Sequence, residues 1–174
     1  MASLLNVNDV KDLNGTDLLI IKQIVEVNNQ THYSGSSTSY TDLFSCSITP
    51  SSTSSKILIV AQLGISKENN HGALARLVKK IGSGSFSAFG GGATGDASRD
   101  ANVWWNVRNT TYNVAPYTVP YLDSPSTTSE VTYKAQIRTT GSSEGWAVNQ
   151  TINTSSNAYT SPIMSSIILF EVAA

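Results

Sequence analysis

Short apolar segments recur along the whole chain, and each is followed by a cluster of Ser, Thr, Gly, Pro or Asn. The apolar segments are rich in β-branched residues and several alternate apolar with polar positions, which is typical of strands. No amphipathic pattern of helical period extends beyond about three turns. The sequence therefore predicts an all-β fold, an antiparallel β-sandwich or jelly roll of about eight or nine strands.

Some of the expected strands are better marked than others. Lys56–Ile65 is apolar enough to be the central strand of a sheet. Ala73–Ile81 could form a helical stripe, but it is short and ends in a Gly-Ser-Gly turn, so we predict a strand. The polar stretch 28–39 and the glycine-rich stretch 83–95 are predicted to be loops. The predicted strands are Leu18–Val27, Tyr40–Ile48, Lys56–Ile65, Ala73–Ile81, Asn102–Val107, Tyr117–Leu122, Val131–Thr139, Trp146–Ile152 and Met164–Val172.

Two polar segments led by a proline resemble each other. Residues 50–55 and residues 125–130 each lie between a predicted strand that ends before the proline and one that begins after the polar run. Proline fixes φ and the hydroxyl groups can bond the local backbone, so both segments suit turns. We predict two similar connections in a sandwich of two layers, with a duplicated ligand loop as the alternative.

Composition excludes several classes of partner. Ser, Thr and Asn make up a third of the 174 residues, whereas charged residues make up 13 %. A net charge of −1 and a pI of 6.1 give no electrostatic reason to expect nucleic acid, anionic lipid or an acidic substrate. The longest aliphatic run, Ile57–Ala61, is far too short for a membrane helix, and the N-terminus lacks the pattern of a secretory signal. We therefore expect a protein made in a cytoplasm that binds neither nucleic acid nor membrane.

The sequence carries none of the usual catalytic or metal-binding motifs. Cys46, the only cysteine, lies in a predicted strand and is expected to be a buried thiol. His32 and His71 lie in polar surroundings and are expected to be solvated. A calcium site at Asp96 and Asp100 is disfavoured, because the spacing is not that of an EF-hand and an arginine lies between them. We expect no catalytic residue, no metal and no cofactor.

Trp104 and Trp105 are adjacent aromatic residues in a predicted strand. Neighbours on a strand point to opposite faces, so one indole can enter the core while the other faces outward or into a partner. Four further aromatic residues could add to the same surface: Tyr112, Tyr117, Tyr121 and Trp146. Such residues pack cores and subunit interfaces and also stack on sugars, so we favour a core or interface role, with sugar binding as the alternative.

Six segments, in their order and spacing, carry a resemblance to a known family. They are Ile20–Val25, Ser37–Tyr40, Ser47–Leu58, Tyr121–Ser129, Thr132–Arg138 and Ile168–Val172. Together they resemble tail-fibre-like virion proteins of bacteriophages, which are common in phages of aquatic bacteria and cyanobacteria. The resemblance extends over about residues 18 to 172 and implies a jelly-roll head, of the type found in TNF and C1q, that assembles as a homotrimer on the virion.

The family resemblance divides the chain into residues 1–17, an N-terminal arm, and residues 18–174, the jelly-roll head. Family members often sit at the end of a long fibre, but the arm has no shaft repeat or coiled-coil heptads. A short knob fixed to the particle fits better. Apolar residues recur at every third position of the arm and are predicted to attach it to a partner or to sister chains. They are Leu4, Val7, Val10 and Leu13.

We therefore expect a non-enzymatic capsid decoration protein, a knob or cement protein, that lies on the virion surface and is assembled in the host cytoplasm. Its partners would be its own copies and the major capsid protein. The second hypothesis is a receptor-binding tip joined to the tail by an adaptor, with host-surface glycan as a further partner. A glycan hydrolase or lyase is least favoured, because Asp42, Glu68 and Asp123 are not paired in sequence. The predicted trimer-interface or glycan-contact residues are Trp104, Trp105, Tyr112 and Tyr117.

Overall fold

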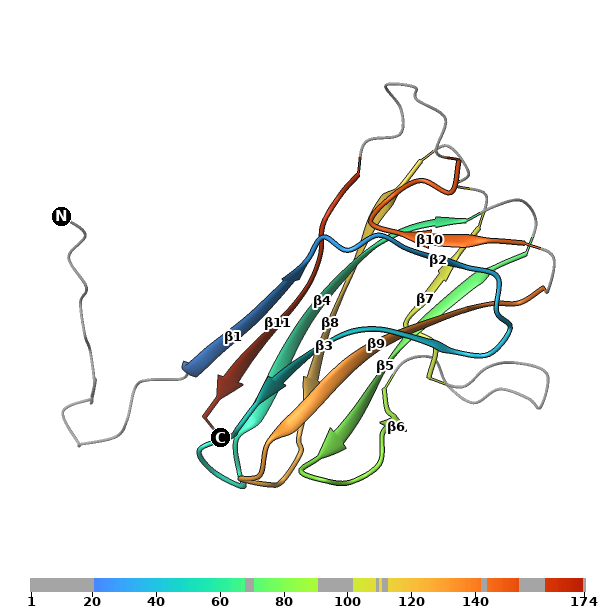
Figure 1. The fold of residues 1–174 in the computed structure, drawn as a ribbon. Helices are drawn as coiled ribbons and strands as arrows, with labels where there is room; N and C mark the ends of the chain where they lie inside the picture. The colour runs from blue at the N-terminus through green and yellow to red at the C-terminus, as the bar shows by residue number, and fades with distance from the viewer. Residues whose placement is uncertain are drawn as a thin grey trace, which may run out of the picture.

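The computed structural model describes residues 21–67, 71–90, 102–108, 110, 113–141, 144–153 and 162–173. They form two antiparallel sheets that pack face to face (Figure 1). None of the described segments is a helix long and apolar enough to cross a membrane. The all-β sandwich predicted from the sequence is confirmed.

The first sheet has six strands. They are β1 (Ile21–Asn29), β2 (Tyr33–Gly35), β4 (Lys56–Lys67), β8 (Ala115–Asp123), β10 (Trp146–Val148) and β11 (Ser165–Val172). Their order is β1-β11-β4-β10-β2, and β8 also pairs with β4. Because β1 pairs with β11, Ile21 lies opposite Val172 at one corner of the sheet.

The second sheet has five strands. They are β3 (Thr41–Ile48), β5 (Ala73–Ile81), β6 (Ser87–Ala88), β7 (Trp105–Val107) and β9 (Val131–Thr139). Their order is β3-β9-β5-β6, and β7 also pairs with β5. Residues 73–81, whose period was ambiguous, pair with β9 along their whole length, so the strand prediction is confirmed.

Two predicted loops contain short strands. Residues 28–39 include β2, and residues 83–95 include β6. Both loop predictions are therefore wrong in part. Each of these strands is held by pairing with a distant segment, β2 with β10 and β6 with β5, and neither has an apolar alternation of its own. A local pattern could not have shown them.

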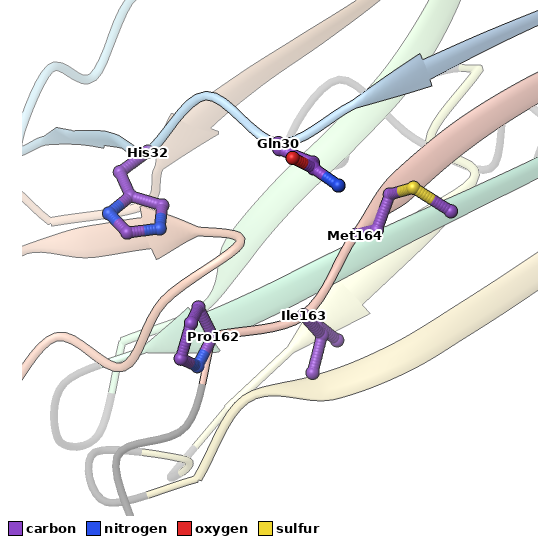
Figure 2. A pocket seen from close by; sticks show the side chains of 5 residues that line it. All are labelled: Gln30, His32, Pro162, Ile163 and Met164. Carbon is purple, nitrogen blue, oxygen red and sulfur yellow. The ribbon is translucent and has the colours of Figure 1, made fainter.

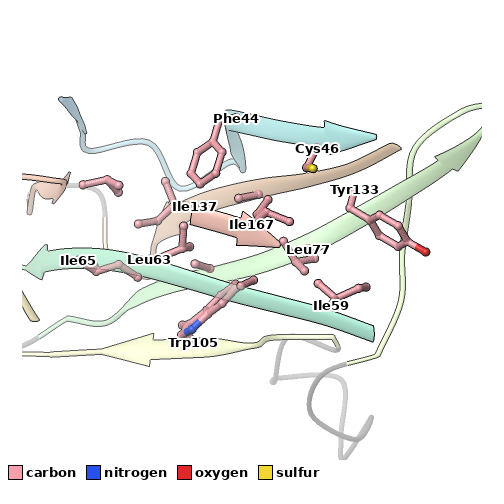
Figure 3. Packing of buried hydrophobic residues seen from close by; sticks show 14 of the residues in the cluster. Phe44, Cys46, Ile59, Leu63, Ile65, Leu77, Trp105, Tyr133, Ile137 and Ile167 are labelled. Carbon is pink, nitrogen blue, oxygen red and sulfur yellow. The ribbon is translucent and has the colours of Figure 1, made fainter. Parts of the chain in front are cut away.

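The core lies between the two sheets, as Figure 3 shows. Ile59 and Leu63 of β4 face it from the first sheet, and Leu77 of β5 and Ile137 of β9 face it from the second. All four side chains are completely buried. Burial of apolar surface of this kind is the main force that holds a sandwich together.

The two proline-led segments connect the layers. Residues 49–55 run from β3 in the second sheet to β4 in the first, and residues 124–130 run from β8 in the first sheet to β9 in the second. The predicted pair of similar connections between two layers is confirmed. The first connection is also anchored, because the carboxylate of Glu171 accepts hydrogen bonds from Ser51 and Ser55.

Candidate functional site

The first sheet has a second apolar surface, on the side that faces away from the core. Its centre is a row of side chains that crosses four strands: Ile24 pairs with Phe170, Phe170 with Leu58, and Leu58 with Leu122. Alternate residues of a strand point to opposite faces, so these four lie on the side opposite the buried residues next to them. We call this surface the outer face. Its apolar members are Ile21, Ile24, Leu58, Val60, Pro120, Leu122, Ile168, Phe170 and Val172.

The outer face is exposed in the single chain. Ile24 is 58 % exposed, Leu122 50 % and Ile21 43 %, although all three are large apolar side chains. Leu58 and Phe170, in the middle of the row, are half-buried and do not belong to the core cluster. A sheet with one face on the core normally carries polar residues on its other face. The outer face departs from that rule and is the strongest candidate for an interaction surface.

Charges lie at the border of the outer face. Glu26 of β1 is in register with Ile168, and Lys56 of β4 is in register with Val172. Both side chains are exposed, and they have opposite signs. The apolar row between Ile24 and Leu122 contains no charge.

The structure places the residues of the predicted aromatic site in different surroundings. Trp105 is 4 % exposed, and its Nε1 donates a 3.0 Å hydrogen bond to the carbonyl oxygen of Tyr117. Its indole therefore fills the core of its own chain and has no surface left for a partner or a sugar, which corrects its assignment as a contact residue. Trp104 is half-buried, and its Nε1 donates to the carbonyl oxygen of Phe89 at 3.0 Å.

Trp104 also packs against other rings. Its indole lies 5.4 Å from the ring of Phe89 and 5.1 Å from that of Tyr121, measured between centroids. Tyr117 is half-buried and packs against the core. A role for Trp104 or Tyr117 at an interface or on a glycan stays a prediction. The predicted site residues outside the described part of the chain are Leu4, Val7, Val10, Leu13 and Tyr112.

One polar cluster joins residues that are far apart in the sequence. Nζ of Lys67, which is completely buried, lies 3.1 Å from Oε2 of Glu144, and the backbone N–H of His71 donates to the same oxygen at 2.9 Å. Desolvation would raise the pKa of Glu144, but the hydrogen bonds from His71 and Lys67 outweigh it and lower the pKa. The backbone of His71 is thus tied to a carboxylate, whereas its side chain is 52 % exposed, as the sequence predicts. The cluster holds Lys67 and His71 against Glu144.

Two of the three acids considered for glycan hydrolysis, Asp42 and Asp123, form ion pairs. Oδ2 of Asp42 lies 2.8 Å from Nζ of Lys134, and Oδ1 of Asp123 lies 2.7 Å from Nζ of Lys79. Glu68 and the pair Asp96 and Asp100 lie outside the described residues. Within the part of the chain that the structure describes, no three His, Cys, Asp or Glu side chains come together as metal ligands.

A surface hollow of about 410 Å³ lies where the chain passes from β1 to β2 and where it enters β11. Figure 2 shows its lining, which comes from Gln30 and His32 on one side and from Pro162, Ile163 and Met164 on the other. These side chains include no fixed charge. The hollow therefore offers a mixed polar and apolar surface without a group that would select a charged ligand.

Comparison with known proteins gives weak likenesses. No family model matches the chain, and no curated protein matches it in sequence. The chain is similar to part of the structure of infectious bursal disease virus Gx strain, at 12 % identity and a TM-score of 0.34, over 88 % of this chain and 39 % of that one. It is also similar to part of the T=1 particles derived from infectious bursal virus, at 13 % identity and a TM-score of 0.37, over 87 % of this chain and 36 % of that one. The chain thus spans less than two-fifths of either.

Proposed function

We propose that the protein is a non-enzymatic structural protein of a bacteriophage virion, a homotrimeric decoration protein of the knob or cement type on the capsid surface. The outer face carries this proposal. A contiguous exposed apolar surface marks a site of protein contact, and here it lies on a sheet whose other side already fills a complete core. The resemblance of the segments between residues 18 and 172 to phage virion proteins supplies the setting.

A decoration protein would act by mass action. Because it binds the assembled shell and not the free capsid subunits, its binding free energy is added to the stability of the shell. The partner would be the major capsid protein. Residues 1–17, with Leu4, Val7, Val10 and Leu13, would provide the apolar strip that docks on it.

A receptor-binding tip, joined to the tail by an adaptor, is the second candidate. The half-buried rings of Trp104 and Tyr121, which lie 5.1 Å apart between centroids, favour it. Aromatic faces that remain partly open can stack on sugars of a host-surface glycan. The resemblance to tail-fibre-like proteins agrees with this position as well.

The copy number of the chain in purified virions separates the two candidates. If quantitative mass spectrometry finds about as many copies of this chain as of the major capsid protein, the result supports the decoration protein. A copy number close to that of the tail-fibre proteins supports the tip instead. Absence from purified particles contradicts both. Deletion of residues 1–17 should abolish incorporation while the head still folds, and unchanged incorporation would rule out the arm as the attachment.

A further inference from the structure

We propose, resting on the homotrimer proposed above, that the outer face is the surface through which copies of this chain contact one another. The row Ile24, Phe170, Leu58, Leu122 would be its centre. Of the residues predicted from the sequence as trimer contacts, Trp105 lies in the core and Trp104 packs against Phe89. The outer face is a continuous apolar surface that the sequence did not predict, and it can supply the contact.

The sequence of β4 agrees with burial on both faces. Strands that are covered on both sides have a nearly continuous apolar sequence, and Ile57–Ala61 is such a run. Within one chain only alternate members of that run are covered. Ile57, Ile59 and Ala61 are completely buried, whereas Leu58 and Val60 are left partly exposed. A strand of this composition is expected where a second layer covers the sheet.

The charges at the border favour a second copy over other partners. The border of the outer face has Glu26 at one side, Lys56 at another and the exposed Lys22 next to Ile21, so it carries both signs and few charges in all. In a ring of three copies, Lys56 of one copy can lie toward Glu26 of the next, so the two sides of the face are complementary to each other. Nucleic acid or an anionic membrane would require a face rich in Lys and Arg, and the outer face is not.

The size of the outer face fits a contact between copies. Four strands spaced ~4.8 Å apart and about seven residues long at ~3.3 Å each cover on the order of 440 Å² in the plane of the sheet. A standard interface buries ~800 Å² on each partner, so the outer face would supply about half of such an interface and its margins would have to supply the rest. In a three-fold arrangement a face directed at the axis contacts both neighbours, so one patch can serve the whole trimer.

The test changes the two most exposed members of the row. Ile24→Lys and Leu122→Lys place a charge at each end of the row, where burial is least and the fold should tolerate it. The matched control is Ile81→Lys, since Ile81 is 40 % exposed and lies in β5 of the other sheet. Leu122→Gln is the milder variant if either lysine substitution reduces the yield of folded protein. Far-UV circular dichroism checks the fold of each variant.

Light scattering over a concentration series gives the oligomeric state. We expect a trimer for the unaltered chain and for Ile81→Lys, and at least a tenfold weaker association, or a monomer, for Ile24→Lys and Leu122→Lys. An oligomer that persists unchanged in both variants overturns the outer face as the contact but leaves the trimer intact. A dimer that both variants dissociate supports the contact and overturns the trimer. If the unaltered chain is monomeric at every concentration, the proposed contact is overturned. Mass spectrometry of purified virions then still tests, on its own, whether the chain is a virion protein.

Discussion

The hydroxyl of Tyr133 in β9 donates a 2.8 Å hydrogen bond to Oδ2 of Asp123 in β8, and this contact joins the two sheets of the sandwich. Nζ of Lys79 in β5 adds contacts of 2.7 and 2.8 Å to the two carboxylate oxygens. Burial, and then the charge of Asp123, raise the pKa of Tyr133, so the phenol stays protonated and remains a donor. The two sheets are therefore held together by polar contacts as well as by the apolar core.

Asp123→Ala should destabilise the fold strongly. The substitution leaves Lys79 and Tyr133 without their acceptor in a site that is nearly buried, and removal of one partner from such a pair costs about 3–5 kcal/mol. Urea unfolding followed by tryptophan fluorescence measures the loss. The control is Asp42→Ala, which breaks the more exposed pair with Lys134 and should cost less than about 1 kcal/mol. Equal losses in the two variants would contradict the role given to Asp123.

Glu171 should make stability depend on pH. Burial would raise the pKa of this carboxyl, but hydrogen bonds from Ser51, Ser55 and Gln23 outweigh it, so the pKa lies below its ordinary value of 4.5. A carboxylate whose pKa is lower in the folded state stabilises the fold at neutral pH. That contribution is lost as the pH falls below about 4.5 toward the folded-state pKa.

Glu171→Gln should therefore flatten the acid side of the stability profile. At neutral pH the variant is expected to lose about 1–3 kcal/mol of unfolding free energy. The reason is that the buried donors then bind a neutral amide oxygen, which is a weaker acceptor than a carboxylate. Below the ordinary glutamate pKa its stability should approach that of the unaltered protein. Urea midpoints measured at several pH values give the profile. Glu130→Gln, at an exposed glutamate, is the control and should keep the original slope.

Gly35→Ala should destabilise the pairing of β2 with β10. A Cβ at this position would lie 2.8 Å from Cζ2 of Trp146, a side chain that is almost completely buried. Overpacking of this kind costs about 1–3 kcal/mol. Trp146→Phe removes the atom that clashes, so Gly35→Ala should cost far less in that background. Urea unfolding of the two single variants and the double variant tests this coupling, and strictly additive losses would speak against it.

Cys46 should be unreactive in the folded protein. Its thiol is almost completely buried, its Sγ lies 3.9 Å from the carbonyl oxygen of Val25, and burial raises its pKa to about 11. Because the thiolate is the reactive form, a thiol-specific chromogenic reagent at about pH 8 should label the chain only after unfolding in urea. Rapid labelling of the native protein would show that β3 opens or that the thiol is accessible.

Most strands that the sequence predicts correctly carry a clear period, and Ala73–Ile81, whose period is ambiguous, is marked by its short length and the turn that follows it. Val131–Thr139 alternates clearly and was predicted with the observed bounds, and the apolar run in β4 placed that strand inside its sheet. Contacts made over long sequence distances had no such signal. Glu171 binds Ser51, and Lys67 binds Glu144, through pairs that only the folded topology brings together. The outer face was missed for another reason: an apolar position shows that a side chain is suited to burial, but not whether its own chain covers it.

The pairing of Ile21 with Val172 has a practical consequence for anyone who labels this protein or uses it to display a peptide. The strand that opens the described chain and the strand that closes it reach the same corner, beside the outer face (Figure 1). A bulky fluorescent domain fused after residue 174 would be separated from Val172 by only two residues and would compete for room with whatever docks there. The turn at residues 52–54, between β3 and β4, is a poor alternative position, because Ser51 and Ser55 on either side of it donate hydrogen bonds to Glu171 of β11. Residues 126–129, between β8 and β9, offer a position for an insertion outside that anchored connection.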